Sequence, residues 1–244
     1  MACQTIICAL QLNVFLYALA GGVLPTLLWM WFWLHEDNDH DEPESLLIMT
    51  FLVGMASVFF VIPLQAITLK ISHDLFPWII QTSFIVVVIW AFWEELAKYL
   101  SARWTAFKHP TFTKPIDVFI YMMTASLGFS AMENTILLMG LLIKGHTVAV
   151  INQGAERFLG ASLLHFLTSS VIALCLGLTF YASKSKKLLA LCTGFAIAVV
   201  LHSLYNFFII ENDKQNTFHV LLSVWILVIL LTISLERVKR IKNF

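Results

Sequence analysis

The stretch from residue 45 to residue 71, SLLIMTFLVGMASVFFVIPLQAITLKI, decides the fold of this chain. It contains no acidic residue, and no basic residue before Lys70. A helix needs about 20 apolar residues to cross the hydrocarbon core of a bilayer, and this stretch exceeds that length. Six further apolar segments occupy about 5–34, 77–101, 116–144, 156–181, 187–210 and 217–236. The sequence therefore predicts an all-α, polytopic transmembrane helical bundle of about seven spans, with room for an eighth.

The composition excludes an ordinary soluble domain. Of 244 residues, 59% are hydrophobic and 12% are charged, whereas soluble domains carry roughly 25% charged residues. Because the spans leave no room for a soluble catalytic domain, we expect one transmembrane domain over residues 1–244. The formal net charge is zero, so the chain lacks the basic field that attracts a protein to nucleic acid. The four cysteines lie in or beside apolar segments and are interpreted as helix-packing residues.

Lysine and arginine are distributed unequally between the loops. Most of them lie in the loops around residues 103–114 and 184–187 and in the tail from residue 237, which share one side of a seven-span chain. The positive-inside rule then predicts a cytoplasmic carboxyl terminus and an external amino terminus. The first segment lacks a basic region and a small-residue cleavage site, so we interpret it as a retained span. The acidic segment at residues 35–44 is interpreted as a solvated charge run in preference to a partner-binding or calcium-binding loop.

The third segment contains ionisable groups, which are costly inside a membrane and usually face a bundle interior or a water-filled cavity. It ends with WEELAK at residues 93–98. Glu94 and Lys98 are four residues apart, which predicts that they share a helical face, while Glu95 points about 100° away. Taken alone, the spacing of Glu94 and Lys98 fits an ion pair at the membrane interface as well as it fits a functional site.

Three further segments each contribute polar residues within apolar runs. By segment these are Glu133 with Asn134, Arg157 with His165, and His202 with Asn206. A lone histidine in a span more often makes a hydrogen bond between helices than it binds a ligand. Four helices that each supply such a group favour a shared polar cavity instead.

A polar cavity among apolar helices suits peptide hydrolysis. That reaction needs a base to activate water and hydrogen-bond donors to stabilise the developing oxyanion. Glu94 or Glu95 is a candidate general base. His202 and Asn206, which share a face at i, i+4 spacing, suit polarisation of a scissile carbonyl.

A metal-dependent arrangement is the alternative. If a metal is bound, Glu133, His165 and His202 form a three-ligand set that leaves an open position for zinc-bound water. One glutamate of the pair at residues 94–95 then acts as the base. Zinc is the first expectation for the ion, although another divalent metal fits the same ligands.

In the order of its motifs the chain resembles the PrsW family of intramembrane proteases, relatives of the CAAX prenyl protease and bacteriocin-processing superfamily. The matches run from about residue 40 to residue 210. They are Glu94-Glu95-x-x-Lys98, Phe129-x-x-x-Glu133 followed by Asn134, His165 preceded by Arg157, and His202-x-x-x-Asn206. Four motifs in order are more specific than any one of them alone.

The resemblance implies a peptidase in a bacterial cell membrane that cleaves a membrane-associated protein, such as an anti-sigma factor whose first cut starts regulated proteolysis. It implies that Glu94 and Glu95 are essential carboxylates and that Glu133, His165 and His202 complete the site. We add Asn206 as a catalytic candidate, and the supporting residues are Lys98, Phe129, Asn134 and Arg157. The last motif usually ends in aspartate in this family, so Asn206 favours a neutral donor there. The resemblance leaves metal dependence open, because members are labelled both glutamic proteases and metalloproteases.

Two other functions are compatible with the same residues. Intramembrane glutamate, lysine and histidine also form relays in proton-coupled transporters and channels, although the sequence shows no inverted repeat or paired Gly/Pro-broken helices. A non-catalytic membrane scaffold is the other, and only Asn206 at the aspartate position favours it.

A shared site requires that the carboxylates and histidines lie at similar depths in the membrane. Glu133 and His202 are expected near the middle of the membrane, with Glu94 and Glu95 about two turns nearer the cytoplasm. The gap closes if the third helix continues through residues 101–104. Carboxylates more than about 12 Å from His202 would exclude a common site, because catalytic groups must reach one water molecule.

Overall fold

The structure is a computed structural model that describes residues 2–35, 42–211, 217–239 and 241. These residues form helices and connecting turns, with no strand among them. The helices are α1 (Ala2–His35), α2 (Glu44–Leu75), α3 (Phe84–Thr105), α4 (Pro115–Ile143), α5 (Thr147–Glu156), the π-helix η1 (Arg157–Ala161), α6 (Ser162–Leu178), α7 (Lys184–Glu211) and α8 (Thr217–Lys239). Most of the acidic segment, residues 36–41, lies outside the described residues.

The helices reproduce the seven predicted segments. Helices α5, η1 and α6 follow one another as a single run, Thr147–Leu178, which corresponds to the fifth segment. Six of the long helical runs in the described ranges are apolar and long enough to cross a membrane. The remaining long helix is α3, which carries the ionisable groups at residues 94–98. The predicted fold class, a transmembrane helical bundle of about seven spans, is confirmed.

Helix α3 begins later and ends later than the sequence suggested. The sequence suggested a start near residue 77. Pro77 instead lies in turns that continue to Ser83, and α3 begins at Phe84. The Ser83 hydroxyl accepts a hydrogen bond from the Ile80 N–H, which stabilises this turn. At its other end α3 continues to Thr105. Glu94 and Glu95 therefore lie at the middle of the helix, and the depth gap expected from the sequence does not exist.

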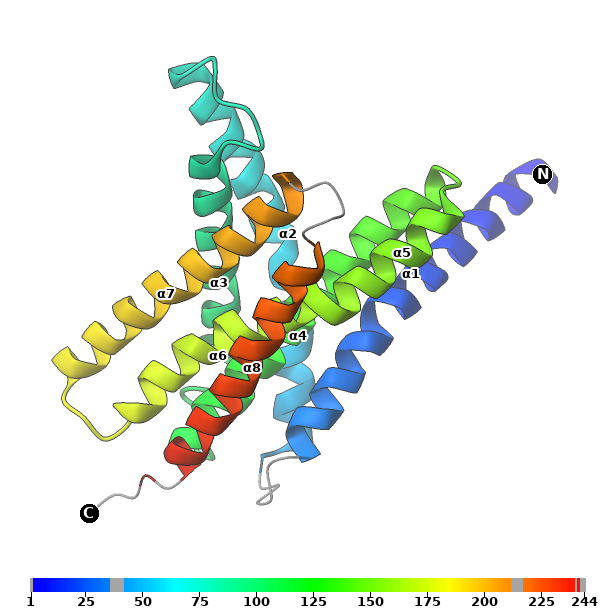
Figure 1. Cartoon of the computed structure of the whole chain (residues 1–244). Coiled ribbons are helices and arrows are strands. Elements are labelled where there is room, and N and C mark those ends of the chain that lie inside the picture. The colour runs from blue at the N-terminus through cyan, green and yellow to red at the C-terminus, as the bar shows by residue number, and fades with distance from the viewer. Residues whose placement is uncertain (1, 36–41, 212–216, 240, 242–244) are drawn as a thin grey trace.

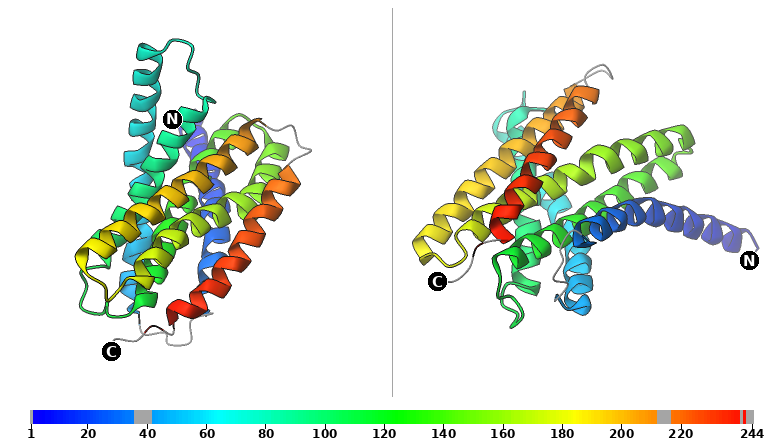
Figure 2. Two further views of the ribbon diagram at one scale, coloured as in Figure 1. Left: turned by 60° about the vertical axis from the view of Figure 1, so that its left-hand side comes forward. Right: turned by 60° about the horizontal axis from the view of Figure 1, so that its bottom comes forward.

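Helix α4 is the central helix of the bundle. Every residue from 115 to 131 is buried, and α4 packs against α1, α2 and α6. Helices α2 and α3 run steeply across the direction of α4 (Figure 1), while α7 and α8 flank α6 (Figure 2, left). The site residues on α3, α4, α6 and α7 therefore face a common interior.

Two glycines allow α2 and α4 to touch through their backbones. A Cβ atom on Gly54 would lie 2.2 Å from the carbonyl oxygen of Ala125, and one on Gly128 would lie 2.1 Å from that of Phe51. Small residues at such crossings let membrane helices approach closely. The outer surface is instead rich in exposed large apolar side chains, as expected of helices in a bilayer.

Candidate active site

The structure brings the predicted carboxylates and imidazoles into one buried cluster. Four helices contribute to it: α3, α4, α6 and α7. Nδ1 of His202 lies 2.7 Å from Oε1 of Glu95, and its Nε2 lies 3.5 Å from Oε2 of Glu94. These distances are far below the 12 Å limit set above, so the groups can act on one water molecule. The members are Glu94, Glu95, Glu133, His165 and His202.

Glu95 is held by three neighbours at a single oxygen. Its Oε1 accepts hydrogen bonds from Lys98 Nζ at 2.8 Å and from Thr168 Oγ1 at 2.8 Å, in addition to the contact with His202. Glu95 is fully buried. A carboxylate bound in this way orients its neighbours and has little freedom to move.

Lys98 pairs with Glu95 and not with Glu94 as its spacing suggested. Its Nζ also lies 2.7 Å from Nδ1 of His165 and 5.0 Å from the centroid of the Phe129 ring. Lys98 is fully buried, so the interpretation of an ion pair at the membrane interface is wrong. The reason is that α4 and α6 cover this part of α3 and supply partners for the ammonium group.

Glu94 keeps one oxygen without a hydrogen-bond partner. Its Oε1 accepts a hydrogen bond from Gln65 Nε2 at 2.9 Å. Its Oε2 is buried and has no such partner among the described residues, although it faces Nε2 of His202. Gln65, on α2, was missed by the sequence reasoning, as was Thr168 one turn after His165. For Gln65 the available signal was a side-chain amide in an otherwise apolar run. For Thr168 it was a hydroxyl on the same helical face as His165.

Glu133 lies on the other side of the cluster and is bound by two cationic or polar groups. Its Oε2 lies 2.8 Å from Nε2 of His165 and accepts a hydrogen bond from Nη2 of Arg157 at 2.6 Å. The Arg157 Nε group also donates to Oδ1 of Asn134, whose Nδ2 donates to Ser162 Oγ at 3.2 Å. Arg157 begins the π-helix η1, a local widening of the helix that is frequent at functional sites.

Two cavities meet at the cluster. One, of about 230 Å³, is lined by Glu133, His165, His202 and Asn206 among others. The other cavity, of about 180 Å³, lies between α2, α3 and α4 and is lined by Gln65, Glu94 and Glu133. Glu133, a third of whose side chain is exposed, borders both.

One subset of the cluster fits a divalent metal. Glu94, His165 and His202 each offer a ligand atom, and these atoms lie within 4.8 Å of one another. One carboxylate and two imidazoles are a common ligand set for catalytic zinc. The unpartnered Oε2 of Glu94 supports the fit, and Glu95 holds Nδ1 of His202 so that its Nε2 is directed inward. The predicted set had Glu133 in place of Glu94; in the structure Oε2 of Glu133 contacts Arg157 and His165. The two ring nitrogens of His165 contact Lys98 and Glu133, so His165 would exchange one of these contacts for the ion.

Buried carboxylates and imidazoles inside a transmembrane bundle are typical of intramembrane enzymes and of ion-translocating proteins. More narrowly, the chain belongs to the PrsW family, since the model described as "PrsW family intramembrane metalloprotease" matches residues 42–233. The protein is therefore a peptidase of the bacterial membrane, whose substrates are membrane-embedded proteins. This membership favours a peptidase over the transporter and the scaffold.

Curated relatives agree with the family match. Protease PrsW of Halalkalibacterium halodurans is 26% identical over 225 residues, which cover 91% of this chain and 95% of that protein. Protease PrsW of Geobacillus kaustophilus is 22% identical over 231 residues, covering 93% and 92%. Protease PrsW of Bacillus subtilis is 22% identical over 194 residues, covering 78% and 81%. No solved structure matches the chain.

Proposed function

We propose that this chain is a metal-dependent intramembrane endopeptidase, one domain over residues 1–244, that cleaves a single-span regulatory protein such as an anti-sigma factor. The observation that carries the proposal is the convergence of Glu94, His165 and His202, whose ligand atoms lie within 4.8 Å of one another inside the bundle. Three separate helices supply these groups, and all three side chains are buried. Oε2 of Glu94 is buried without a hydrogen-bond partner among the described residues, as is Oε2 of Glu95, and a buried carboxylate oxygen ordinarily has a partner.

The residues divide into those that hold the ion and those that position them. Glu94, His165 and His202 would hold the ion, with zinc as the first expectation. Bound there, zinc supplies Lewis-acid chemistry and a water molecule activated at neutral pH. Glu95 is a positioning residue, because it fixes the ring of His202 and neutralises Lys98.

Glu133 is the proposed general base and acid. Its Oε2 is held by Arg157 and His165, which leaves Oε1 to take a proton from water in the adjoining cavity. The water oxygen bonds to the scissile carbonyl carbon, and Glu133 returns the proton to the amide nitrogen as the C–N bond breaks. Asn206 lines the same cavity, where its Nδ2 donates a hydrogen bond to the developing oxyanion.

The proposed placement in the membrane follows from the distribution of basic residues. Loops and tail on the side of the carboxyl terminus carry most of the lysine and arginine. We infer a cytoplasmic carboxyl terminus and an external amino terminus on that basis. Tags at each end, probed with protease in intact cells, give the orientation directly.

Cleavage by the purified full chain tests the proposed function. The chain is reconstituted into liposomes with a tagged single-span anti-sigma factor, and product is quantified over time. Glu94→Gln and His202→Ala should each lower kcat/KM by at least about 100-fold, the scale expected for loss of a catalytic group. Glu44→Gln, at an exposed carboxylate on α2, should match the unsubstituted chain. Undiminished cleavage by either site variant would overturn the assignment.

A further inference from the structure

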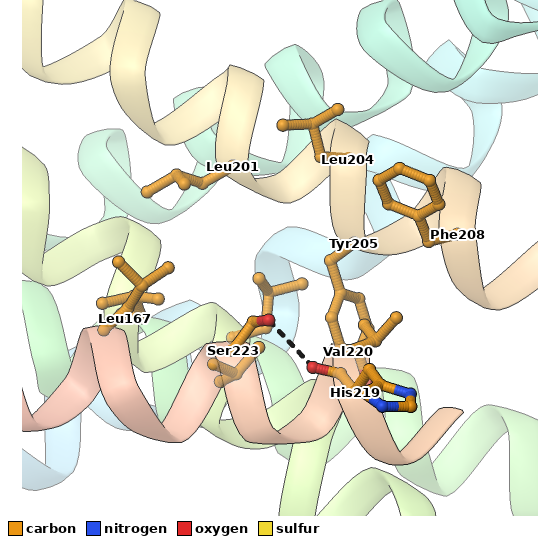
Figure 3. A pocket seen from close by; sticks show the side chains of 11 residues that line it. Leu167, Leu201, Leu204, Tyr205, Phe208, His219, Val220 and Ser223 are labelled. Atoms are coloured by element: carbon orange, nitrogen blue, oxygen red, sulfur yellow. Dashed lines mark hydrogen bonds between the residues drawn. The ribbon is translucent and has the colours of Figure 1, made fainter. Parts of the chain in front are cut away.

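An apolar groove lies between α7 and α8, beside the candidate active site. It encloses about 480 Å³, which is within the range of ligand-binding pockets. Leu164 and Leu167 of α6 form its floor, and residues of α7 and α8 form its two walls. Figure 3 shows Leu201, Leu204 and Phe208 on the α7 wall opposite the α8 wall.

The lining of the groove suits an apolar occupant. No lysine, arginine, aspartate or glutamate of the described residues contributes to it. The hydroxyl of Ser223 donates to the carbonyl oxygen of His219 at 2.8 Å (Figure 3). Its hydrogen bond is therefore made within α8 and does not require a polar group on a bound ligand. Besides Ser223, the polar side chains of the lining are Tyr205 and His219, and a charged ligand would lose more hydration in the groove than these few groups replace.

The groove is continuous with the candidate active site. Leu164 and Tyr205 line both the groove and the cavity that contains His165 and His202. On α7, Leu201 faces the groove while the adjacent His202 faces the cluster. A peptide segment of another protein that fills the groove would therefore lie next to the candidate catalytic residues.

The groove also opens toward the lipid. Leu204 is 38% exposed and Phe208 is 46% exposed. Both α7 and α8 are long and apolar enough to cross the membrane, so we expect the opening between them to face lipid. An apolar segment already in the membrane can enter without passing through water.

We propose that this groove docks the apolar membrane-spanning segment of the protein substrate and presents the adjoining peptide to the site. The inference rests on the proposed function and adds the place of substrate entry, between α7 and α8. Continuity with the cavity favours a substrate over a lipid or a second copy of the chain, since neither of those would need access to His202.

Site-specific photo-crosslinking tests the docking directly. In a Glu94→Gln background, which keeps the substrate intact, benzoylphenylalanine replaces Phe208 in the groove or Ile197 elsewhere on α7. Ile197 is similarly exposed, at 43%, but does not line the groove. With a tagged single-span anti-sigma factor in liposomes, position 208 should crosslink to its membrane segment at least about 5-fold more than position 197. Equal yields, or crosslinks only to lipid or to a second copy, would overturn the proposal.

A pair of serines on α8 provides a second test in the full chain. Ser223 lines the groove, whereas Ser234 does not, and each donates its hydroxyl to the carbonyl oxygen four residues earlier. Ser223→Trp should fill the groove and raise KM for the single-span substrate about 10-fold, with kcat within about 2-fold. Ser234→Trp should leave both constants unchanged. A fall in kcat with unchanged KM, or no effect of Ser223→Trp, would contradict the docking role.

The two tests separate this inference from the proposed function. If the unsubstituted chain does not cleave the substrate, the proposed function fails, but the crosslinking yield still shows whether the substrate occupies the groove. If cleavage occurs and crosslinking at position 208 does not exceed that at position 197, only the entry route is wrong.

Discussion

Nδ1 of His202 lies 2.7 Å from Oε1 of Glu95, so a carboxylate at the middle of α3 holds an imidazole of α7. This contact fixes the orientation of the ring and directs its Nε2 toward Glu94, 3.5 Å away. A carboxylate that holds the second nitrogen of a histidine is typical of metal sites, where it sets the tautomer and strengthens the ligand. In the proposed mechanism Glu94 would hold the ion, whereas Glu95 positions His202.

Glu95→Gln tests the positioning role of this residue. The amide removes the negative charge that faces Lys98 and weakens the acceptor for His202. We expect kcat for a single-span substrate to fall about 10-fold to 100-fold, as for other residues that support metal ligands. Thr168→Val is the control, because it removes one donor to Glu95 and keeps the carboxylate. Equal activities of the two variants would contradict the role.

Gln65→Leu tests whether α2 supports the site. The substitution removes the Nε2 donor to Oε1 of Glu94 and leaves both oxygens of that buried carboxylate without a hydrogen bond. We expect about 10-fold to 100-fold lower kcat/KM. Thr68→Val, one turn further along α2, removes the acceptor for the Trp93 indole instead and should change activity by less than about 3-fold. A larger loss in Thr68→Val would show that α2 acts through packing alone.

Lys98→Met tests the buried charge pair. Without the ammonium group, the buried Glu95 loses its lysine partner and keeps its contacts with Thr168 and the imidazole of His202; breaking a buried pair by removing one partner costs about 3–5 kcal/mol. Titration with a denaturing detergent should report this loss in the free energy of unfolding. Lys187→Met is the matched control, since this lysine is exposed and its Nζ lies over the Phe180 ring, 5.5 Å from the centroid. Similar stabilities of the two variants would refute a buried pair.

Gly128→Ala tests the backbone contact between α2 and α4. A new Cβ atom would lie 2.1 Å from the carbonyl oxygen of Phe51, and backbone atoms cannot give way without separating the helices. We expect the free energy of unfolding to fall by about 1–3 kcal/mol, with lower activity because α2 carries Gln65. Gly140→Ala on the same helix meets no atom within 4 Å and should be neutral or stabilising by up to about 1 kcal/mol. The reverse order would contradict the crossing.

Much of the fold could be predicted because membrane helices must be long and apolar. The run at residues 45–71 corresponds to α2, and the other segments to the remaining long helices. The start of α3 was misplaced because Trp78, Ile79 and Ile80 are apolar, and hydropathy alone does not show that Pro77 and Ser83 belong to turns.

The members of the site could be predicted because ionisable groups in spans are rare, but their pairings could not. Spacing on α3 permits Lys98 to pair with either glutamate, and the choice of Glu95 depends on contacts with His165 and Thr168 of another helix. Gln65 was missed because an amide in a span is ordinarily a hydrogen bond between helices. The proposed ligand set has Glu94 where the sequence suggested Glu133. The contact of Arg157 with Glu133 arises from the packing of α4 against η1, which spacing along the chain does not show.

Metal analysis of the purified chain tests most directly whether Glu94, His165 and His202 form a metal-dependent peptidase centre. Inductively coupled plasma mass spectrometry should find about one zinc or other divalent ion per chain. Glu94→Ala and His202→Ala should reduce the content below about 0.2 per chain, while Glu44→Ala retains it, and chelation should abolish cleavage. Full cleavage by a chain that contains no stoichiometric metal and resists chelators would contradict the account.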